Sequence, residues 1–203
     1  MTRVALITGA SGGLGQALVA EFLAGDWRVV AGFHHENFHP ETDRLWPLRL
    51  DVTSRENVEE AVAQVTAGWE RVDLLINNAG NTADGLVGQL SDEDWQRVLD
   101  VHLKGAFLCS QAVLRPMLRQ RDGHILNIAS FSARTGNRGQ ANYAAAKAGQ
   151  LAPFQRAGLV WRRGMSVRES GPTGQWPGVK VEVVSIGFSV AGSSWYGIAS
   201  EYT

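Results

Sequence analysis

Short apolar runs alternate along this chain with longer stretches in which apolar residues recur at the spacing of a helix. Runs that are apolar on both faces are typical of strands buried in a parallel sheet, and the stretches between them of helices that cover it. The runs predict strands at residues 4–8, 28–33, 48–50, 74–77 and 124–129. We therefore expect an α/β fold of the Rossmann type, a three-layer, doubly wound parallel sheet, in a single domain of residues 1–203.

Start and stop signals refine the helices between these strands. Thr53 with Glu56 three residues later has the spacing of a capping box, and apolar residues then recur at helical spacing. Ser91 with Asp94 predicts a second helix start. Pro116 predicts the end or a kink of the long helix that follows, because proline removes a backbone donor inside a helix.

Composition and charge narrow the class of protein. Of 203 residues, 44% are hydrophobic and 19% are charged, which is typical of a globular chain, and the formal net charge is −1. A net charge this close to zero favours neither a nucleic acid nor an anionic membrane as a partner. No apolar run approaches the ~20 residues of a membrane-spanning helix and no signal peptide precedes the first strand, so we expect a cytoplasmic protein. The single cysteine, Cys109, is expected to be a buried core residue.

A glycine-rich turn follows the first predicted strand and opens a helix. Glycines let the backbone turn tightly and approach a diphosphate, whose charge is favoured by the amide groups and the dipole of the helix start. Alone, such a turn is only a tight strand-to-helix connection, but its place in a βαβ unit favours dinucleotide binding. The candidate cofactor-binding residues of the turn are Gly9, Ser11, Gly12, Gly13, Leu14 and Gly15.

Further candidates follow the third and fourth predicted strands. Asp51 and Val52 come after the third strand, and Asn78, Ala79 and Gly80 come after the fourth. Ligands of open α/β sheets bind at the carboxyl ends of the strands, so we expect these residues to join the glycine turn in one site.

Tyr143 and Lys147 are candidates for acid–base chemistry. They stand four residues apart in an alanine-rich stretch that favours helix, which places both side chains on one face. A phenol in water ionises only near pH 10, and a nearby ammonium stabilises its anion, so such a pair can exchange a proton near neutrality. Ser130 follows the fifth strand and is expected to donate a hydrogen bond to a substrate oxygen as that oxygen gains charge. The spacing alone would more often mark an exposed helical pair; Ser130 and the glycine turn favour the functional interpretation.

In this order the motifs resemble the short-chain dehydrogenase/reductase family, with Thr-Gly-x-x-x-Gly-x-Gly from residue 8, Asp-Val from 51, Asn-Asn-Ala-Gly from 77, and the Ser130, Tyr143, Lys147 set. The resemblance implies a nicotinamide-dependent oxidoreductase acting on a carbonyl or an alcohol. It implies that Asp51 meets the adenine and that Asn78 and Gly80 line the central wall of the cofactor site. It also implies that Lys147 holds the cofactor ribose beside Tyr143.

The type of nicotinamide cofactor depends on the end of the second strand. A carboxylate there hydrogen-bonds a ribose 2′-hydroxyl and repels a 2′-phosphate. Phe33, His34 and His35 stand there instead, with Glu36 close by and no arginine placed to hold a phosphate. We therefore expect NADP(H) rather than NAD(H), with His34 in the cofactor site. The histidines, with His39, are interpreted as solvated loop residues and not as metal ligands, because no cysteine or acidic set completes a metal site.

Two stretches are similar to particular members of the family. Residues 137–149 strongly resemble bacterial 3-oxoacyl-carrier-protein reductases, and residues 28–32 resemble acetoacetyl-coenzyme A reductases. Both kinds of enzyme use NADPH to reduce a 3-oxoacyl thioester, so the resemblance implies a small carbonyl or acyl-thioester substrate and a homo-oligomer, dimer or tetramer. A broad-specificity ketone or steroid dehydrogenase and a catalytically impaired nicotinamide-binding protein remain alternatives.

His102 departs from the family pattern. The family usually has asparagine at this place in Val-Asn-Leu-Lys-Gly, where it helps to hold a water in a proton relay through the lysine; here the stretch is Val-His-Leu-Lys-Gly. Histidine both donates and accepts hydrogen bonds, so His102 is a candidate catalytic residue. The alternative is a helix histidine that only packs.

The resemblance covers residues 4–149 and is lost over residues 150–203. Pro153 is expected to end or bend the helix that carries Tyr143. Residues 178–188 resemble the sixth strand of the family, but its substrate-covering loop and helix and its seventh strand have no counterpart. We expect an incomplete or divergent C-terminal part, at a cost to substrate affinity more than to cofactor binding.

Overall fold

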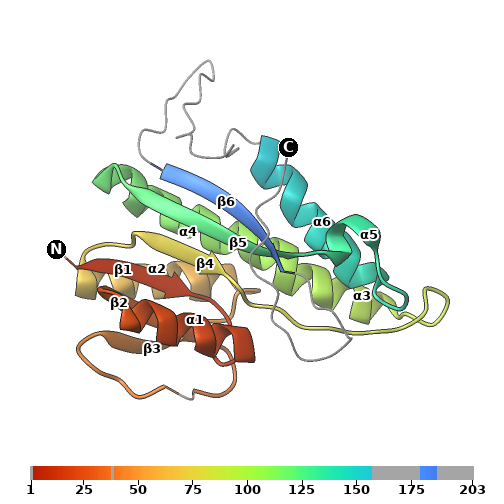
Figure 1. The fold of residues 1–203 in the computed structure, drawn as a ribbon, viewed down its shortest axis with the longest axis horizontal. Coiled ribbons are helices and arrows are strands. Elements are labelled where there is room, and N and C mark those ends of the chain that lie inside the picture. The colour runs from red at the N-terminus through yellow and green to blue at the C-terminus, as the bar shows by residue number, and fades with distance from the viewer. Residues whose placement is uncertain (1, 38, 157–178, 187–203) are drawn as a thin grey trace.

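The computed structural model describes residues 2–37, 39–156 and 179–186. These residues form a parallel sheet of six strands in the order β3-β2-β1-β4-β5-β6 (Figure 1). The order reverses between β1 and β4, and such a switch point opens a crevice at the carboxyl ends of the strands. The expected Rossmann-type fold is confirmed. The strands are β1 (Arg3–Ile7), β2 (Trp27–Phe33), β3 (Leu45–Arg49), β4 (Leu74–Asn77), β5 (Gly123–Ser130) and β6 (Val179–Ile186).

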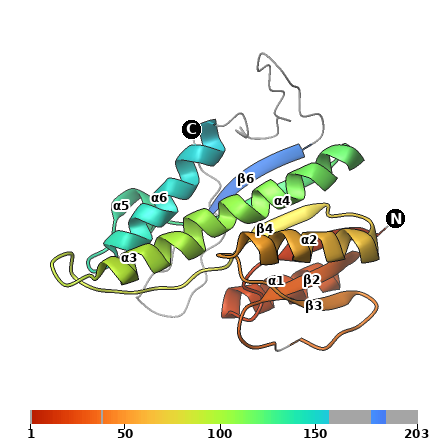
Figure 2. The same cartoon turned by 180° about the vertical axis from the view of Figure 1, so that it is seen from behind.

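Helices cover both faces of this sheet. Figure 1 shows α1 in front of the strands, and Figure 2, from behind, shows α2 and α4 on the opposite face. Val4 and Leu6 belong to a buried apolar cluster with α2 and α4, whereas Ala5 and Ile7 belong to one with α1, so β1 is buried on both faces. The helices are α1 (Gly13–Ala24), α2 (Arg55–Trp69), α3 (Asp92–Leu99), the π-helical turn η1 (Asp100–Lys104), α4 (Gly105–Gln120), α5 (Ser132–Thr135) and α6 (Ala141–Arg156).

The edge strand β3 begins earlier than predicted. It pairs with β2 from Leu45 opposite Val29 to Arg49 opposite Phe33, whereas the sequence predicted residues 48–50. The strand contains Pro47, which has no backbone N–H for a ladder hydrogen bond. An edge strand tolerates this because one of its sides has no neighbouring strand to bond.

One of the two predicted helix starts is shifted by one residue. The N-cap of α2 is Ser54, whose hydroxyl accepts a hydrogen bond from the Asn57 amide, so the predicted capping box at Thr53 is wrong. The hydroxyl and amide of Thr53 instead donate to a carboxylate oxygen of Asp51. Ser91 caps α3 by accepting from the amide of Asp94, as predicted.

The two prolines that were predicted to end or bend helices both lie inside them. Pro116 lies within α4, and the irregular part of that long helix is the π turn η1 that precedes it. Pro153 lies within α6, which continues to Arg156. A helix end at either proline is therefore wrong, whereas a kink or bend at these positions stays a prediction. Around Pro116, burial of Val113 and Met117 anchors α4 to the core and offsets the missing hydrogen bond.

The predicted sixth strand is confirmed as β6, which pairs with β5 from Gly123 opposite Val179 to Ser130 opposite Ile186. The covering loop and helix and the seventh strand, which the sequence predicted to be missing, concern residues 187–203, outside the described residues.

Candidate active site

Close backbone contacts hold the glycine turn between β1 and α1. Gly9 has a φ of +65°, and a Cβ on it would lie 2.7 Å from the Cα of Ala79. A Cβ on Gly15 would overlap the carbonyl oxygen of Gly9. Gly12 is the N-cap of α1, and no side chain caps the amide groups of the first turn. The turn therefore needs glycine and presents a helix start that can bind an anion.

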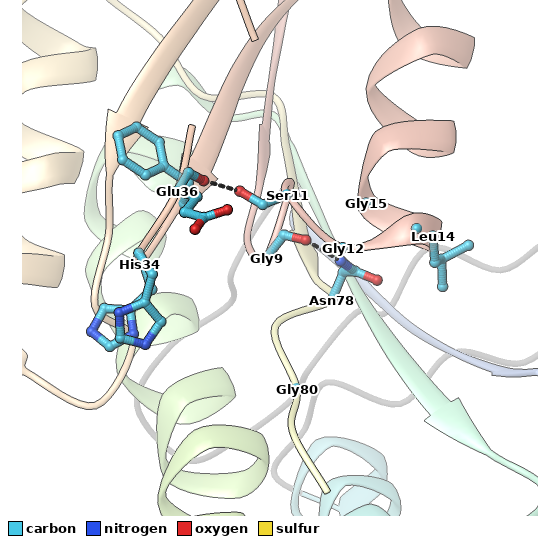
Figure 3. Close-up of a pocket in the computed structure, with 12 residues that line it drawn as sticks. Gly9, Ser11, Gly12, Leu14, Gly15, His34, Glu36, Asn78 and Gly80 are labelled. Atoms are coloured by element: carbon cyan, nitrogen blue, oxygen red, sulfur yellow. Dashed lines mark hydrogen bonds between the residues drawn. The ribbon is translucent and has the colours of Figure 1, made fainter. Parts of the chain in front are cut away.

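A cavity of about 490 Å³ lies beside this turn. Figure 3 shows its walls, which come from the turn, the start of α1, the end of β2 and the chain after β4. Its size and its uncapped helix start fit a dinucleotide. The lining residues are Gly9, Ser11, Gly12, Gly13, Leu14, Gly15, Phe33, His34, His35, Glu36, Asn78 and Gly80.

Two alanine substitutions in the turn should have opposite effects on stability. Gly15→Ala should lower the free energy of unfolding by about 2 kcal/mol, because the added methyl meets backbone that cannot move aside. Gly13→Ala is the matched control, since its Cβ would have no atom within 4 Å, and it should raise that free energy by up to about 1 kcal/mol. Urea unfolding of both variants measures this, and equal effects would contradict the close contact at Gly15.

The end of β4 is tied directly to the turn. The Asn78 side chain donates to the carbonyl oxygens of Thr8 and Gly9, at 2.9 and 3.1 Å. The Thr8 hydroxyl accepts from the amides of Asn78 and Ala79, at 3.0 and 2.9 Å. Asn78 and Gly80 line the cavity, whereas Ala79 lines an internal space behind it. Thr8 opens the glycine motif, but the sequence did not single it out as a site residue.

Asp51 and Val52 lie outside the lining of the cavity. The Asp51 carboxylate accepts the two hydrogen bonds from Thr53 and lies 3.5 Å from Nε2 of His34. Burial acts to raise the pKa of Asp51, but the hydrogen bonds from Thr53, with His34 and Arg49 nearby, outweigh it and hold that pKa below its usual value. Asp51 is thus a carboxylate beside His34, which lines the cavity, and its predicted contact with the adenine stays a prediction. Val52 lines the internal space.

A second cavity, of about 370 Å³, adjoins the first, because Leu14, Asn78 and Gly80 line both. Tyr143 and Lys147 of α6 line it together with His102 of the π turn and with the last part of β5. Its other lining residues are Asn81, Thr82, His102, Ile128, Ala129, Tyr143 and Lys147.

Lys147 is a buried cation in this second cavity. Its side chain is 3% exposed, and its Nζ donates to the carbonyl oxygen of Ile128 at 2.5 Å and lies 5.9 Å from the centre of the Tyr143 ring. Burial lowers the pKa of Lys147 to about 8. An ammonium that still carries its proton at pH 7, beside a phenol in the same cavity, is a pair suited to proton transfer.

Ser130 lines neither of the two cavities in this structure. It is the last residue of β5, but its hydroxyl donates to the hydroxyl of Ser132 at 3.2 Å and accepts from the Ser132 amide. Ala129, its neighbour, lines the second cavity, whereas Ser130 is not among the lining residues. The sequence predicted Ser130 at this edge and could not predict the partner of its hydroxyl.

His102 lies against Tyr143 with the two rings edge to face, their centres 5.1 Å apart and their planes at 89°. Burial lowers the pKa of His102 to about 4, the charge of Lys147 adds to this effect, and the hydrogen bond with the Asn81 backbone acts against it. His102 is therefore a neutral imidazole at pH 7.

Sequence reasoning missed two buried polar residues of α6. Asn142 has its amide nitrogen 2.9 Å from the Ala83 carbonyl oxygen, which ties the start of α6 to the chain after β4. Gln150 donates to the carbonyl oxygen of His102 at 2.8 Å. Position beside the Tyr-x-x-x-Lys motif was the available signal for both.

Other features bear on the predicted class of site. Within the described residues, no group of three or more histidine, cysteine or acidic side chains is placed to hold a metal ion. None of the helices in the described part of the chain combines the length and the apolar character needed to cross a membrane. Cys109 is buried, as predicted, and burial raises the pKa of its thiol to about 12.

Comparisons with known proteins agree with this geometry. Residues 3–161 match the sequence model of the short chain dehydrogenase family. The chain is 41% identical over 157 residues to a 3-oxoacyl-(acyl-carrier-protein) reductase of Thermotoga maritima, a match that covers 73% of this chain and 64% of that protein. It is 38% identical over 177 residues to the 3-oxoacyl-(acyl-carrier-protein) reductase of Escherichia coli, covering 84% of this chain and 72% of that protein.

A solved structure shows the same fold. The crystal structure of a short-chain dehydrogenase from Streptomyces avermitilis superposes with a TM-score of 0.75 at 28% identity, covering 92% of this chain and 67% of that one. The matched part of this chain thus spans about two thirds of the length of these relatives.

Proposed function

The chain belongs to the short-chain dehydrogenase family, and from this premise we propose that it is an NADPH-dependent oxidoreductase that reduces a 3-oxoacyl thioester or a similar small ketone to the alcohol. The observation that carries the proposal is the Tyr143–Lys147 pair in a cavity that adjoins the glycine turn. The 3-oxoacyl reductases among the relatives support the choice of substrate class.

The first cavity is the proposed cofactor site. The amide groups at the start of α1, after Gly12, would hold the diphosphate. Asn78 and Gly80 line both cavities, so they would lie beside the cofactor at the point where it enters the second. When bound, the reduced nicotinamide supplies the hydride that the carbonyl carbon accepts.

Tyr143, Lys147 and Ser130 would carry the proton chemistry. The Tyr143 hydroxyl gives its proton to the substrate oxygen as the carbonyl becomes an alkoxide. The charged Lys147 stabilises the phenolate that remains and holds the ribose. Ser130 orients the substrate oxygen once its hydroxyl turns from Ser132, a rotation about one bond.

The end of β2 supports NADPH over NADH. His34 and His35 line the first cavity with their rings 3.9 Å apart, where a carboxylate would repel a 2′-phosphate. Glu36 also lines this cavity, and its carboxylate acts against a 2′-phosphate, so the preference rests on the histidines directly after β2. The Glu36 backbone carbonyl accepts a hydrogen bond from the Ser11 hydroxyl at 2.5 Å (Figure 3).

The test is consumption of NADPH by the purified chain with acetoacetyl-coenzyme A, with NADH run in parallel. We expect turnover with NADPH and at least about tenfold lower kcat/KM with NADH, as a single added phosphate contact allows. Turnover of simple ketones with none of the thioester would favour a broad-specificity ketone dehydrogenase.

A second candidate function follows from His102. Because histidine stands where the resemblance implies a relay asparagine, a nicotinamide-binding protein without turnover is the alternative. A rise in melting temperature with NADPH, and no turnover across a panel of carbonyl compounds, would favour it over the reductase.

A further inference from the structure

Gln150 is a buried glutamine that the proposed chemistry does not yet use. It lies on α6, the helix of Tyr143, and its Nε2 donates to the carbonyl oxygen of His102 at 2.8 Å. That carbonyl belongs to the π turn η1, which the amide of Gly105 closes by bonding five residues back to Asp100. A π turn disturbs the regular helical ladder, so a hydrogen bond from outside can fix its position. Gln150 thus ties the irregular turn to the helix of the catalytic pair.

The His102 ring fills the space between two walls of the second cavity. Its Nε2 lies 2.8 Å from the carbonyl oxygen and 3.1 Å from the amide of Asn81. A Cβ on Gly80 would overlap the ring at Cε1, so only glycine allows this approach. On its other side the ring meets Tyr143 edge to face. A shift of the His102 backbone would therefore move the ring against both Gly80 and Tyr143.

Nε2 is the ring nitrogen that holds His102 to the chain after β4, because it faces both the amide and the carbonyl oxygen of Asn81. Nδ1 is buried and has no hydrogen-bond partner among the described residues. The ring is therefore a fixed spacer and not a carrier of charge at neutral pH.

No water can adjust this arrangement from behind. The internal space that His102 and Gln150 line with Val52 and Ala79 has no room for a water-sized sphere. The position of the His102 ring therefore depends on direct contacts. One of them is the hydrogen bond from Gln150, on α6, to the backbone carbonyl of His102.

We propose that Gln150 is a positioning residue for Tyr143: it fixes the backbone of His102, and the His102 ring in turn sets the position of the phenol. The inference rests on the proposed function, in which Tyr143 transfers the proton. It assigns to His102 the role of a spacer, in place of a water-holding relay residue.

Gln150→Met tests this, because methionine keeps the length of the side chain and removes the donor. We expect kcat with NADPH and acetoacetyl-coenzyme A to fall about tenfold with KM unchanged, as a small misplacement of a catalytic group does. Gln120→Met is the matched control, since Gln120 likewise donates to a backbone carbonyl, that of Val72, at 2.6 Å but far from the cavities. In the double variant with His102→Ala, the Gln150 substitution should add little to the loss, because both act through one ring.

A readout without substrate separates this proposal from the reductase itself. In ¹⁵N spectra of the imidazoles, with the signal assigned by its loss in His102→Ala, His102 should stay neutral down to about pH 4 in the parent chain. In Gln150→Met the freed ring should titrate nearer the ordinary value of about 6.5, and in Gln120→Met it should not change. The proposal is overturned if the kcat or the His102 titration of Gln150→Met equals that of Gln120→Met, or if the losses in the double variant multiply. If the parent chain has no turnover, the reductase proposal fails and the His102 titration alone decides this one.

Discussion

Replacing Tyr143 with phenylalanine is expected to lower turnover of the thioester about 10³-fold, the scale of a lost general acid. The substitution removes one hydroxyl and keeps the ring, so the edge-to-face contact with His102 should remain. Lys147 keeps its hydrogen bond to the Ile128 carbonyl, which does not involve Tyr143. The loss should therefore appear in kcat, with the affinity for NADPH nearly unchanged, and steady-state kinetics with a fluorescence titration of NADPH measure the two quantities.

A substitution away from the cavities makes this a specific test. Thr66→Val removes a hydroxyl from α2, and Thr66 lines neither cavity. It should not change turnover by a comparable factor. Retained turnover in Tyr143→Phe would remove Tyr143 from the chemistry, whereas loss of both turnover and NADPH binding would indicate a structural defect.

The sequence predicted the elements of this fold best where burial is complete. β1, β4 and β5 are apolar on both faces, so their runs are continuous and their predicted bounds agree with the structure to within a residue or so. In the edge strand β3, Trp46 and Pro47 are only partly buried, and proline is unusual inside a strand. The first residues of β3 therefore did not have the pattern of a strand. Prolines were given too much weight as helix ends, because the tertiary packing that holds α4 around Pro116 is not visible in a local pattern.

In the site, the sequence predicted those residues whose relative position depends only on local structure. The four-residue spacing of Tyr143 and Lys147 needs only a helix to place them together, and the structure places both in one cavity. The partner of the Ser130 hydroxyl depends on how the chain turns into α5. The Gln150–His102 bond joins residues 48 positions apart, across a π turn that no sequence signal marks. Contacts of this kind follow from the packed fold and could not be read from one sequence.

The burial of Lys147 predicts a large effect of pH on stability. The pKa of Lys147 is about 8 in the folded chain and 10.5 for an exposed lysine, so between these values the unfolded chain binds more protons. The contribution of Lys147 to the free energy of unfolding therefore rises as pH increases from about 8 to 10.5. Below pH 8 the folded chain carries the full cost of burying the ammonium. The shift corresponds to about 3 kcal/mol. Lys147→Met has no such proton, so the free energy of unfolding of the parent minus that of the variant should rise by about 3 kcal/mol over this range.

Urea unfolding of both proteins between pH 7 and 10.5 measures that difference, and the subtraction cancels the titration of groups that they share. Lys104→Met is the matched control, because Lys104 lies on the adjacent turn η1 with its side chain 53% exposed and has no burial cost to lose. The difference in free energy of unfolding between the parent and Lys104→Met should stay constant over the same pH range. A level difference for Lys147→Met as well would mean that the Lys147 ammonium reaches water in solution. A rising difference, together with loss of turnover in Lys147→Met, would show that the chain accepts a less stable fold to keep a proton-transfer group charged near pH 8 inside the cavity.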